Sequence, residues 1–248
     1  MAKAELLLIG DDAGLTSLSN PGATGRWLRT GQALRGAAVR ALWFDPSDAL
    51  FARVVTDEGL YRSDDGGDTW GGIVPLPAYS HVAFLSDGDL VLAGEAGVRR
   101  ADGQPYGSNP PEMIRALVAD RDGLVAATMT GMMVCAGPGA AWQPLDGLET
   151  VQLAARLGGP TPTTIAATPD ALLRSGATGG WEPATTDMPG GAVSALCIAP
   201  YHVDVAFVGT TAGHVLRSGD RGRTWQTIRQ PAQGSGSPVR ALATARVV

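Results

Sequence analysis

The chain is built from short runs in which apolar and polar residues alternate, and none of these runs shows the 3.6-residue spacing of an amphipathic helix. One series of runs opens each repeating unit, and its members begin at Val39, His81, Ile114, Val151, Val193 and Val239. A second series, which includes LVLAGEAGV and VAFVGTTAGHV, ends in turns around Gly, Asp or Pro. Alternation bounded by turn residues is typical of β-strands, so the pattern predicts an all-β chain.

A tryptophan closes a polar, glycine-rich loop at five places: Trp27, Trp70, Trp142, Trp181 and Trp225. Three of the four intervals between these tryptophans are 39 to 44 residues long. The remaining interval, of 72 residues, has Tyr106 at its midpoint, in the degenerate copy ADGQPYGS. The chain therefore holds six units, and each unit holds four short strands in roughly 40 residues.

Repeated four-stranded antiparallel units of this size predict the blades of a β-propeller. Residues 239–248 form an opening strand with no strands after it, whereas residues 4–27 supply the other three strands of a unit. We therefore expect the C-terminal strand to complete the N-terminal blade, which closes the ring and hides its sheet edges. The predicted fold is a single six-bladed domain, with blades at 1–34 together with 239–248, 35–77, 78–111, 112–147, 148–190 and 191–237.

The pattern S-x-D-x-G-x-T-W occurs twice, in residues 63–70 and 218–225, which we call the motif loops. In tight turns, Asp and Ser side chains accept hydrogen bonds from backbone N–H groups, and glycine adopts positive φ. We expect each motif to shape a hairpin tip and its tryptophan to pack between neighbouring blades. The alternative, a calcium loop, needs more oxygen ligands and a bidentate acid. The predicted structural residues are Ser63, Asp65, Gly67, Trp70, Ser218, Asp220, Gly222 and Trp225.

The motif resembles the Asp box, or BNR repeat, of the sialidase-type propellers. Besides the two full copies, partial copies keep the glycine and the tryptophan, as in residues 136–142 (AGPGAAW) and 175–181 (SGATGGW). In that family the box is a folding element away from the active site, so the resemblance implies a fold and not an activity. The F/Y-R-I-P tetrapeptide of true sialidases is absent, and none of the four tyrosines can be paired with a glutamate from the sequence.

Arginine occupies the second position of three opening strands, and such strands line the central channel of a propeller. Guanidinium groups suit carboxylates and phosphates, so these arginines are candidates for an anion site at one mouth of the channel. The candidate ligand-binding residues are Arg40, Arg115 and Arg240, with Asp57 and Glu58 at the rim. The alternative is that the arginines pair with these acids and with Asp12, or simply face solvent.

The net charge of −5 argues against a nucleic-acid partner, which requires a basic stripe. The two cysteines, Cys135 and Cys197, lie in apolar runs and are interpreted as buried thiols. The three histidines are scattered over different repeats, so the sequence predicts neither a metal site nor a cofactor.

The start of the chain, MAKAELLLIGDDAG, has too short an apolar run for a signal peptide and lacks a cleavage site. No stretch approaches the apolar length of a membrane span. These features predict a cytoplasmic monomer without membrane contact. The alternative is an exported protein whose leader is absent from this sequence.

These observations favour a non-catalytic propeller scaffold that binds a protein partner or a small ligand. The expected binding surface is the loop face opposite the motif loops, or the mouth of the channel. The alternative is a glycoside hydrolase or lyase of the sialidase-like propeller type, which would require an acid pair at the channel mouth.

Overall fold

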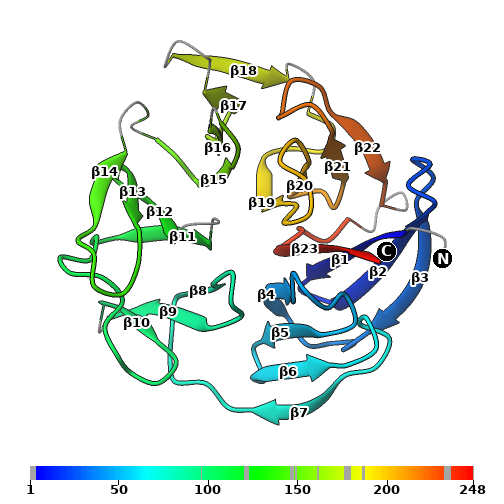
Figure 1. Cartoon of the computed structure of the whole chain (residues 1–248), viewed down its shortest axis with the longest axis horizontal. Coiled ribbons are helices and arrows are strands. Elements are labelled where there is room, and N and C mark those ends of the chain that lie inside the picture. Colours follow the sequence, from blue (N-terminus) through cyan, green and yellow to red (C-terminus); the bar gives the residue numbers. More distant parts are fainter. Residues whose placement is uncertain are drawn as a thin grey trace.

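The computed structural model of the chain describes residues 4–95, 97–119, 123–145, 148, 150–160, 162–175, 180–185, 188–231 and 236–247. Its strands form six antiparallel sheets, which Figure 1 shows arranged around a common centre. We number these sheets as blades 1 to 6 in chain order, starting with the sheet that holds the N-terminal strand.

The strands of each blade follow one another from the centre of the ring outwards in the order in which they pair. Blade 1 contains β23 (Ala241–Val247), β1 (Ala4–Asp11), β2 (Gly14–Pro21) and β3 (Leu28–Ala33). Blade 2 contains β4 (Val39–Phe44), β5 (Ala52–Thr56), β6 (Leu60–Ser63) and β7 (Gly71–Val74). Blade 3 contains β8 (His81–Phe84), β9 (Leu90–Gly94) and β10 (Gly97–Arg100).

Blades 4 to 6 follow the same order. Blade 4 contains β11 (Ile114–Ala119), β12 (Leu124–Thr128), β13 (Gly131–Cys135) and β14 (Gln143–Leu145). Blade 5 contains β15 (Leu153–Leu157), β16 (Thr163–Ala167), β17 (Leu172–Ser175) and β18 (Trp181–Thr185). Blade 6 contains β19 (Val193–Ile198), β20 (Ala206–Thr210), β21 (Val215–Ser218) and β22 (Gln226–Arg229).

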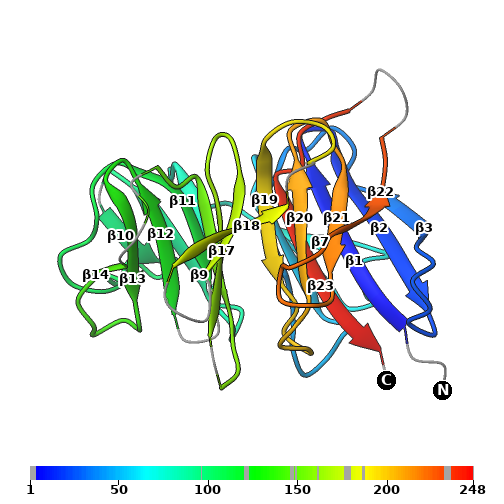
Figure 2. The same cartoon turned by 90° about the horizontal axis from the view of Figure 1, so that it is seen from above.

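The C-terminal strand closes the ring. Strand β23 pairs antiparallel with β1 from Ala241 opposite Gly10 to Val247 opposite Ala4. The innermost strands contact one another in an unbroken circle, β23, β4, β8, β11, β15 and β19, and β19 in turn contacts β23. The prediction of a six-bladed propeller completed by its last strand is therefore confirmed. Figure 2 shows that β1 begins and β23 ends on the same side of the ring.

Blade 3 departs from the four-stranded pattern. In the described residues of this blade, the segment after β10 makes one isolated antiparallel bridge, between Arg99 and Pro105, in place of a fourth strand. Pro105 has no N–H group, so it cannot donate to a continuous ladder.

The antiparallel pairing gives the ring two distinct faces. The innermost strands begin on one face, which we call the arginine face because it carries Arg40, Arg115 and Arg240. They end on the opposite face, where the third strand of a blade also turns back into the fourth. The motif loops lie at that turn in blades 2 and 6, so we call it the hairpin face.

Tryptophans fill the interfaces between blades. Trp70 packs against a cluster that contains Leu8 and Ala243 of blade 1, and Trp225 packs against a cluster that contains Ile165 of blade 5. Trp27 meets the Phe207 ring of blade 6 edge-on, with 5.9 Å between ring centroids. In each case the tryptophan packs against the blade that precedes its own in the ring.

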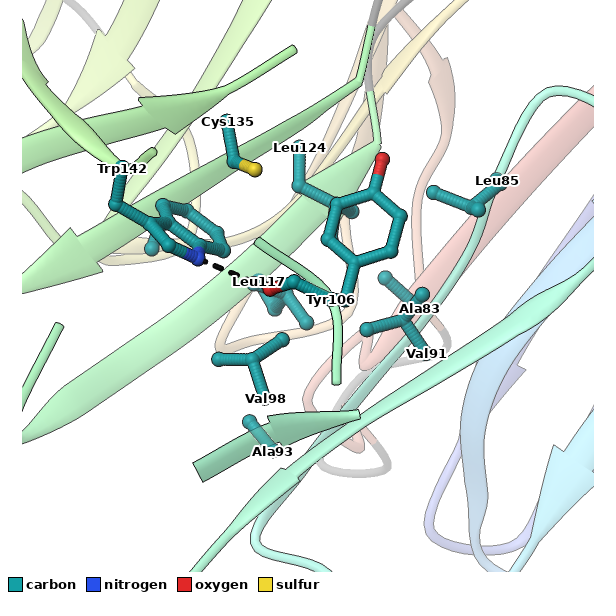
Figure 3. Packing of buried hydrophobic residues seen from close by; sticks show 11 residues of the cluster. Ala83, Leu85, Val91, Ala93, Val98, Tyr106, Leu117, Leu124, Cys135 and Trp142 are labelled. Atoms are coloured by element: carbon teal, nitrogen blue, oxygen red, sulfur yellow. Dashed lines mark hydrogen bonds between the residues drawn. The ribbon is translucent and has the colours of Figure 1, made fainter. Parts of the chain in front are cut away.

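The aromatic of blade 3 lies in a different interface from the one that the repeat spacing suggests. Tyr106 is buried between blades 3 and 4, where Trp142 Nε1 donates to the Tyr106 carbonyl at 3.2 Å (Figure 3). The interface between blades 2 and 3 contains Trp43 of β4, which packs beside Phe84. A side chain at Gly88 would come within 2.7 Å of the Trp43 ring, so this glycine makes room for the indole.

Candidate functional site

A cavity of about 670 Å³ lies along the innermost strands of all six blades. Its lining includes Arg40 at the start of β4 and Pro200 after the end of β19, so the cavity extends between the two faces. The wall is mainly apolar, with side chains such as Leu42, Phe84 and Leu242. An apolar cavity with a few polar groups is the usual form of a binding pocket.

The charged groups of this central cavity are arginines. Arg40, Arg156 and Arg240 line it, and none of its described lining residues is an aspartate or a glutamate. Arg156 was not among the candidate residues predicted from the sequence. Its position near the end of an opening strand, in VQLAARLG, is the signal that could have found it.

Two of the three candidate arginines meet at one acid on the arginine face. Asp12, in the turn between β1 and β2, accepts hydrogen bonds from Arg240 Nη2 at 2.8 Å and Arg240 Nε at 3.1 Å. The Arg40 Nη1 atom lies 3.5 Å from Asp12 Oδ1, which also accepts a hydrogen bond from Arg240 Nε at 3.2 Å. The hydrogen bond from Arg240 lowers the pKa of Asp12. Two guanidinium groups therefore share one carboxylate at this mouth.

The structure places Arg115 apart from the other two. Its Nη2 and Nε atoms lie 2.7 and 2.9 Å from the sulfur of Met129, on blade 4. Arg240 and Arg40 belong to the adjacent blades 1 and 2, whereas blade 3 separates Arg115 from Arg40. Arg115 is not among the residues that line the central cavity.

The two rim acids Asp57 and Glu58 shape their own loop. Asp57 Oδ1 accepts a hydrogen bond from the Ala38 amide at 2.8 Å. The Glu58 carboxylate accepts a hydrogen bond from the Tyr61 hydroxyl, which raises the pKa of Tyr61. Both acids thus bind groups on blade 2 or the segment leading into it, and the shared acid of Arg40 and Arg240 is Asp12 alone.

The first motif loop contains a local hydrogen-bond network. Ser63 Oγ accepts from the Gly67 amide at 2.9 Å and donates to Asp65 Oδ1 at 2.8 Å. Asp65 in turn accepts from the Thr69 amide at 2.9 Å, and Trp70 Nε1 donates to the Gly67 carbonyl at 3.1 Å. The Gly67 and Thr69 amides of this hairpin tip are therefore satisfied by side chains that belong to the motif, whereas the Gly66 amide donates to the Leu50 carbonyl at 2.8 Å.

The second motif loop repeats these contacts. Ser218 Oγ accepts from the Gly222 amide at 2.8 Å, Asp220 Oδ1 accepts from the Thr224 amide at 2.9 Å, and the Trp225 indole donates to Gly222 at 3.2 Å. Of the two partial copies, residues 176–179 of the loop 175–181 lie outside the described residues.

The two motif loops differ at one position of positive φ, which is Gly66 in the first and Arg221 in the second. The guanidinium of Arg221 donates to the Gly158 carbonyl at 3.1 Å and to Thr163 Oγ1 at 3.2 Å, both on blade 5. It also lies 3.3 Å from Asp204 of blade 6. Arg221 thus joins the two blades, and it was not among the candidate residues predicted from the sequence. An arginine where the other copy has glycine is the signal that could have found it.

Other candidate chemistries have little support in the described part of the chain. No group of three or more His, Cys, Asp or Glu residues there could hold a metal ion. Burial raises the pKa of the Cys197 thiol to about 12, so that this thiol is protonated and unreactive at neutral pH. Within the same residues, no helix has the length and apolarity needed to cross a membrane.

Comparison with known proteins supports the fold. No protein-family model matches the sequence, and the curated proteins give no significant match. Among solved structures, "YCF48 bound to D1 peptide" is similar, with a TM-score of 0.51 and 17% identity over 89% of this chain and 77% of that one.

Two glycoside hydrolases of the GH74 group are similar as well. The xyloglucanase from Xanthomonas campestris has a TM-score of 0.53 and 17% identity, and the match covers 92% of this chain and 44% of the enzyme. The Niastella koreensis enzyme has a TM-score of 0.51 and 14% identity, over 90% of this chain and 43% of that one. The chain thus spans less than half of each enzyme, and these identities establish likeness of fold alone.

Proposed function

We propose that this protein is a non-catalytic propeller that binds an extended segment of a partner protein in its central cavity, from the arginine face. The observation that carries the proposal is the cavity of about 670 Å³, with its apolar wall and the Arg40–Asp12–Arg240 cluster at the mouth. Apolar side chains of a peptide would pack against the wall, and an acidic group would add the second negative charge that the two arginines can accommodate.

The similarity to a peptide-bound propeller is consistent with this proposal. The structure "YCF48 bound to D1 peptide" shows that a propeller of related shape can hold a peptide. At 17% identity this likeness concerns the fold, so the proposal rests on the cavity of this chain.

We also propose that the motif loops are Asp boxes of the BNR type. The support is the matching set of contacts, in which Asp65 and Asp220 bind the Thr69 and Thr224 amides at the same distance of 2.9 Å. Both loops lie on the hairpin face, away from the arginine cluster, so their role in this proposal is structural.

The alternative function is a glycoside hydrolase or lyase. Such chemistry uses two carboxyl groups about 5 Å or about 6.5–9.5 Å apart around the scissile bond. The described lining of the central cavity supplies no carboxylate, and Asp12 at its mouth is paired with Arg240 and Arg40. We therefore expect no release of reducing sugar from xyloglucan oligosaccharides. Release that Asp12→Asn abolishes would favour the enzyme instead.

A cavity-blocking substitution tests the binding proposal. Peptides are first selected from a randomised display library for binding to the wild-type protein. Their affinity for the wild type is then compared with their affinity for Val82→Trp, since Val82 lines the cavity on β8. We expect the blocked variant to bind at least tenfold more weakly, by fluorescence anisotropy of the labelled peptide. Val74→Trp, at a position 53% exposed on the outer strand β7, is the matched control and should bind normally.

Two results would overturn the proposal. One is that no peptide can be selected on the wild-type protein. The other is that the selected peptides bind Val82→Trp as tightly as the wild type while both variants retain the thermal stability of the wild type.

A further inference from the structure

A second cavity, of about 730 Å³, lies at the junction of blades 1 and 6, where the ring closes. Its described lining comes from β2 and β3 of blade 1, from the turn before β2, and from β22 of blade 6 and the segment after it. It shares no described lining residue with the central cavity. We call it the junction cleft.

The junction cleft is cationic in an acidic protein. Three arginines line it, Arg29, Arg35 and Arg229, and Asp11 is the single acid among its described lining residues. The whole chain carries a net charge of −5, so this local excess of positive charge is opposite in sign to that of the molecule. Concave surfaces lined by one sign of charge concentrate ligands of the other sign.

Arg229 is the most enclosed of the three. It lies on β22, half-buried, and donates to the Gly213 carbonyl at 3.4 Å. Burial lowers the pKa of Arg229, Asp11 opposes that change, and the nearby charge of Arg29 adds to it. The guanidinium stays protonated at neutral pH all the same, so a half-buried cation here faces a like charge. A bound anion would offset both the burial of the charged guanidinium and its repulsion by Arg29.

The arginine side chains of the junction cleft have more N–H donors than the acceptors that they contact. In the described part of the chain, the Arg29 side chain makes no hydrogen bond and no ion pair, although its backbone pairs with β2. Arg35 donates to Gln32 Oε1 at 3.2 Å, and Asp11 Oδ1 already accepts from the Ala13 amide at 2.8 Å. A guanidinium carries five N–H donors, so most of those in the cleft are available to a ligand.

The junction cleft also has an apolar wall. Trp27 and Ile228 line it, and both pack against the same hydrophobic cluster between blades 6 and 1. The Trp27 ring is fixed by its edge-on contact with Phe207. A ligand held here would therefore meet fixed apolar surface on one side and guanidinium groups on the other.

We propose that the junction cleft binds a small organic anion with at least two negative charges, carried by carboxylate or phosphate groups. Arg29 and Arg229 bind its oxyanions, Arg35 adds to the positive field, and Trp27 packs against its carbon skeleton. This site is separate from the central cavity, so either proposal can fail while the other stands.

Isothermal titration at low ionic strength tests this inference, with citrate and glycerol 3-phosphate as separate probes. We expect one of the two to bind with a stoichiometry of one, and the tighter probe identifies carboxylate or phosphate as the preferred group. Arg29→Gln and Arg229→Gln should each weaken binding at least tenfold. Arg223→Gln is the control: it removes an exposed charge from the second motif loop, on the hairpin face of blade 6. It should leave the affinity within twofold of the wild type.

Asp11→Asn separates electrostatics from damage to the fold. It removes the single acid of the described lining while an amide oxygen can still accept from Ala13. We expect it to tighten binding severalfold, whereas a general loss of structure would weaken it. The inference is overturned if neither probe binds at millimolar concentration, if Arg223→Gln weakens binding as much as Arg229→Gln, or if Asp11→Asn does not tighten it.

Discussion

The carboxylate of Asp65 accepts hydrogen bonds from both the amide and the hydroxyl of Thr69, four residues later. The same two contacts join Asp220 to Thr224, 155 residues further along the chain. Repetition of one network in two blades indicates that the motif encodes the geometry of the hairpin tip. Each network depends on an ionised aspartate, because a charged carboxylate accepts hydrogen bonds more strongly than a neutral one.

Acid should therefore weaken the first motif loop within a defined range of pH. The hydrogen bonds from Thr69 lower the pKa of Asp65 from 3.8 to about 2. A carboxyl group whose pKa is lower in the folded state stabilises the fold above its unfolded pKa, and this contribution disappears as pH falls through the folded pKa. We expect the melting temperature to drop between about pH 4 and pH 2, with a smaller drop in Asp65→Asn. Equal drops in both proteins would contradict this assignment.

Trp225 should carry much of the stability of the interface between blades 5 and 6. It packs against the cluster that contains Ile165 and Leu216, and its indole N–H is bound to Gly222. Deleting a buried aromatic side chain costs about 3 kcal/mol, so we expect Trp225→Ala to lose about that much in urea unfolding. Val74→Ala, at an exposed position on β7, is the control and should change the free energy of unfolding by less than about 0.5 kcal/mol.

Arg221 should stabilise the same interface through its polar contacts. Its guanidinium spans the Gly158 carbonyl and Thr163 of blade 5 and Asp204 of blade 6. We expect Arg221→Gly to destabilise the protein by about 1.5–3 kcal/mol, the range for hydrogen bonds to charged groups, even though glycine suits the positive φ of this position. The natural comparison is Gly66→Ala in the first motif loop, where backbone strain acts alone. An unchanged urea midpoint for Arg221→Gly would show that the guanidinium contacts contribute nothing.

The sequence predicted the number of blades and the closure of the ring because both depend on repeats. The opening strands recur at a regular spacing, and the last one has no strands after it, so its place beside β1 follows from counting. The spacing of the aromatic residues did not predict which interface each of them fills. Tyr106 fits the spacing but lies with Trp142 between blades 3 and 4, because the single bridge from Arg99 to Pro105 leaves the segment after β10 free to take a different course.

The sequence could predict which face of the ring carries these arginines, but not which of them lie close enough to meet. The second position of an opening strand places Arg40, Arg115 and Arg240 on the same face. Which of them meet depends on the blades that carry them, and only Arg40 and Arg240 lie on adjacent blades. The junction cleft had no sequence signal, because Arg29 and Arg229 come together only when the two ends of the repeat array meet.

The strand that closes the ring provides the last prediction. Removing residues 239–248 would turn β1 into an edge strand along its whole length and expose the buried side chains Leu7 and Ile9. An unpaired, apolar edge promotes aggregation, so we expect this truncated chain to lack cooperative unfolding and to aggregate. The measurement is thermal unfolding followed by circular dichroism, together with size-exclusion chromatography.

A circular permutant separates the role of the strand from the role of its connection. Because Val247 lies opposite Ala4, a short linker can join residue 248 to residue 1, and new ends can be placed at Gly36, in the link between blades 1 and 2. This chain keeps every strand, but blade 1 becomes continuous in sequence, so no blade is built from both ends of the chain. We expect it to fold with the native far-ultraviolet spectrum and to unfold faster than the native chain, because only side-chain packing between blades 1 and 2 then closes the ring. If the permutant unfolds at the native rate, closure by a shared blade is not what slows unfolding, and the interfaces between blades alone account for the kinetic stability of the ring.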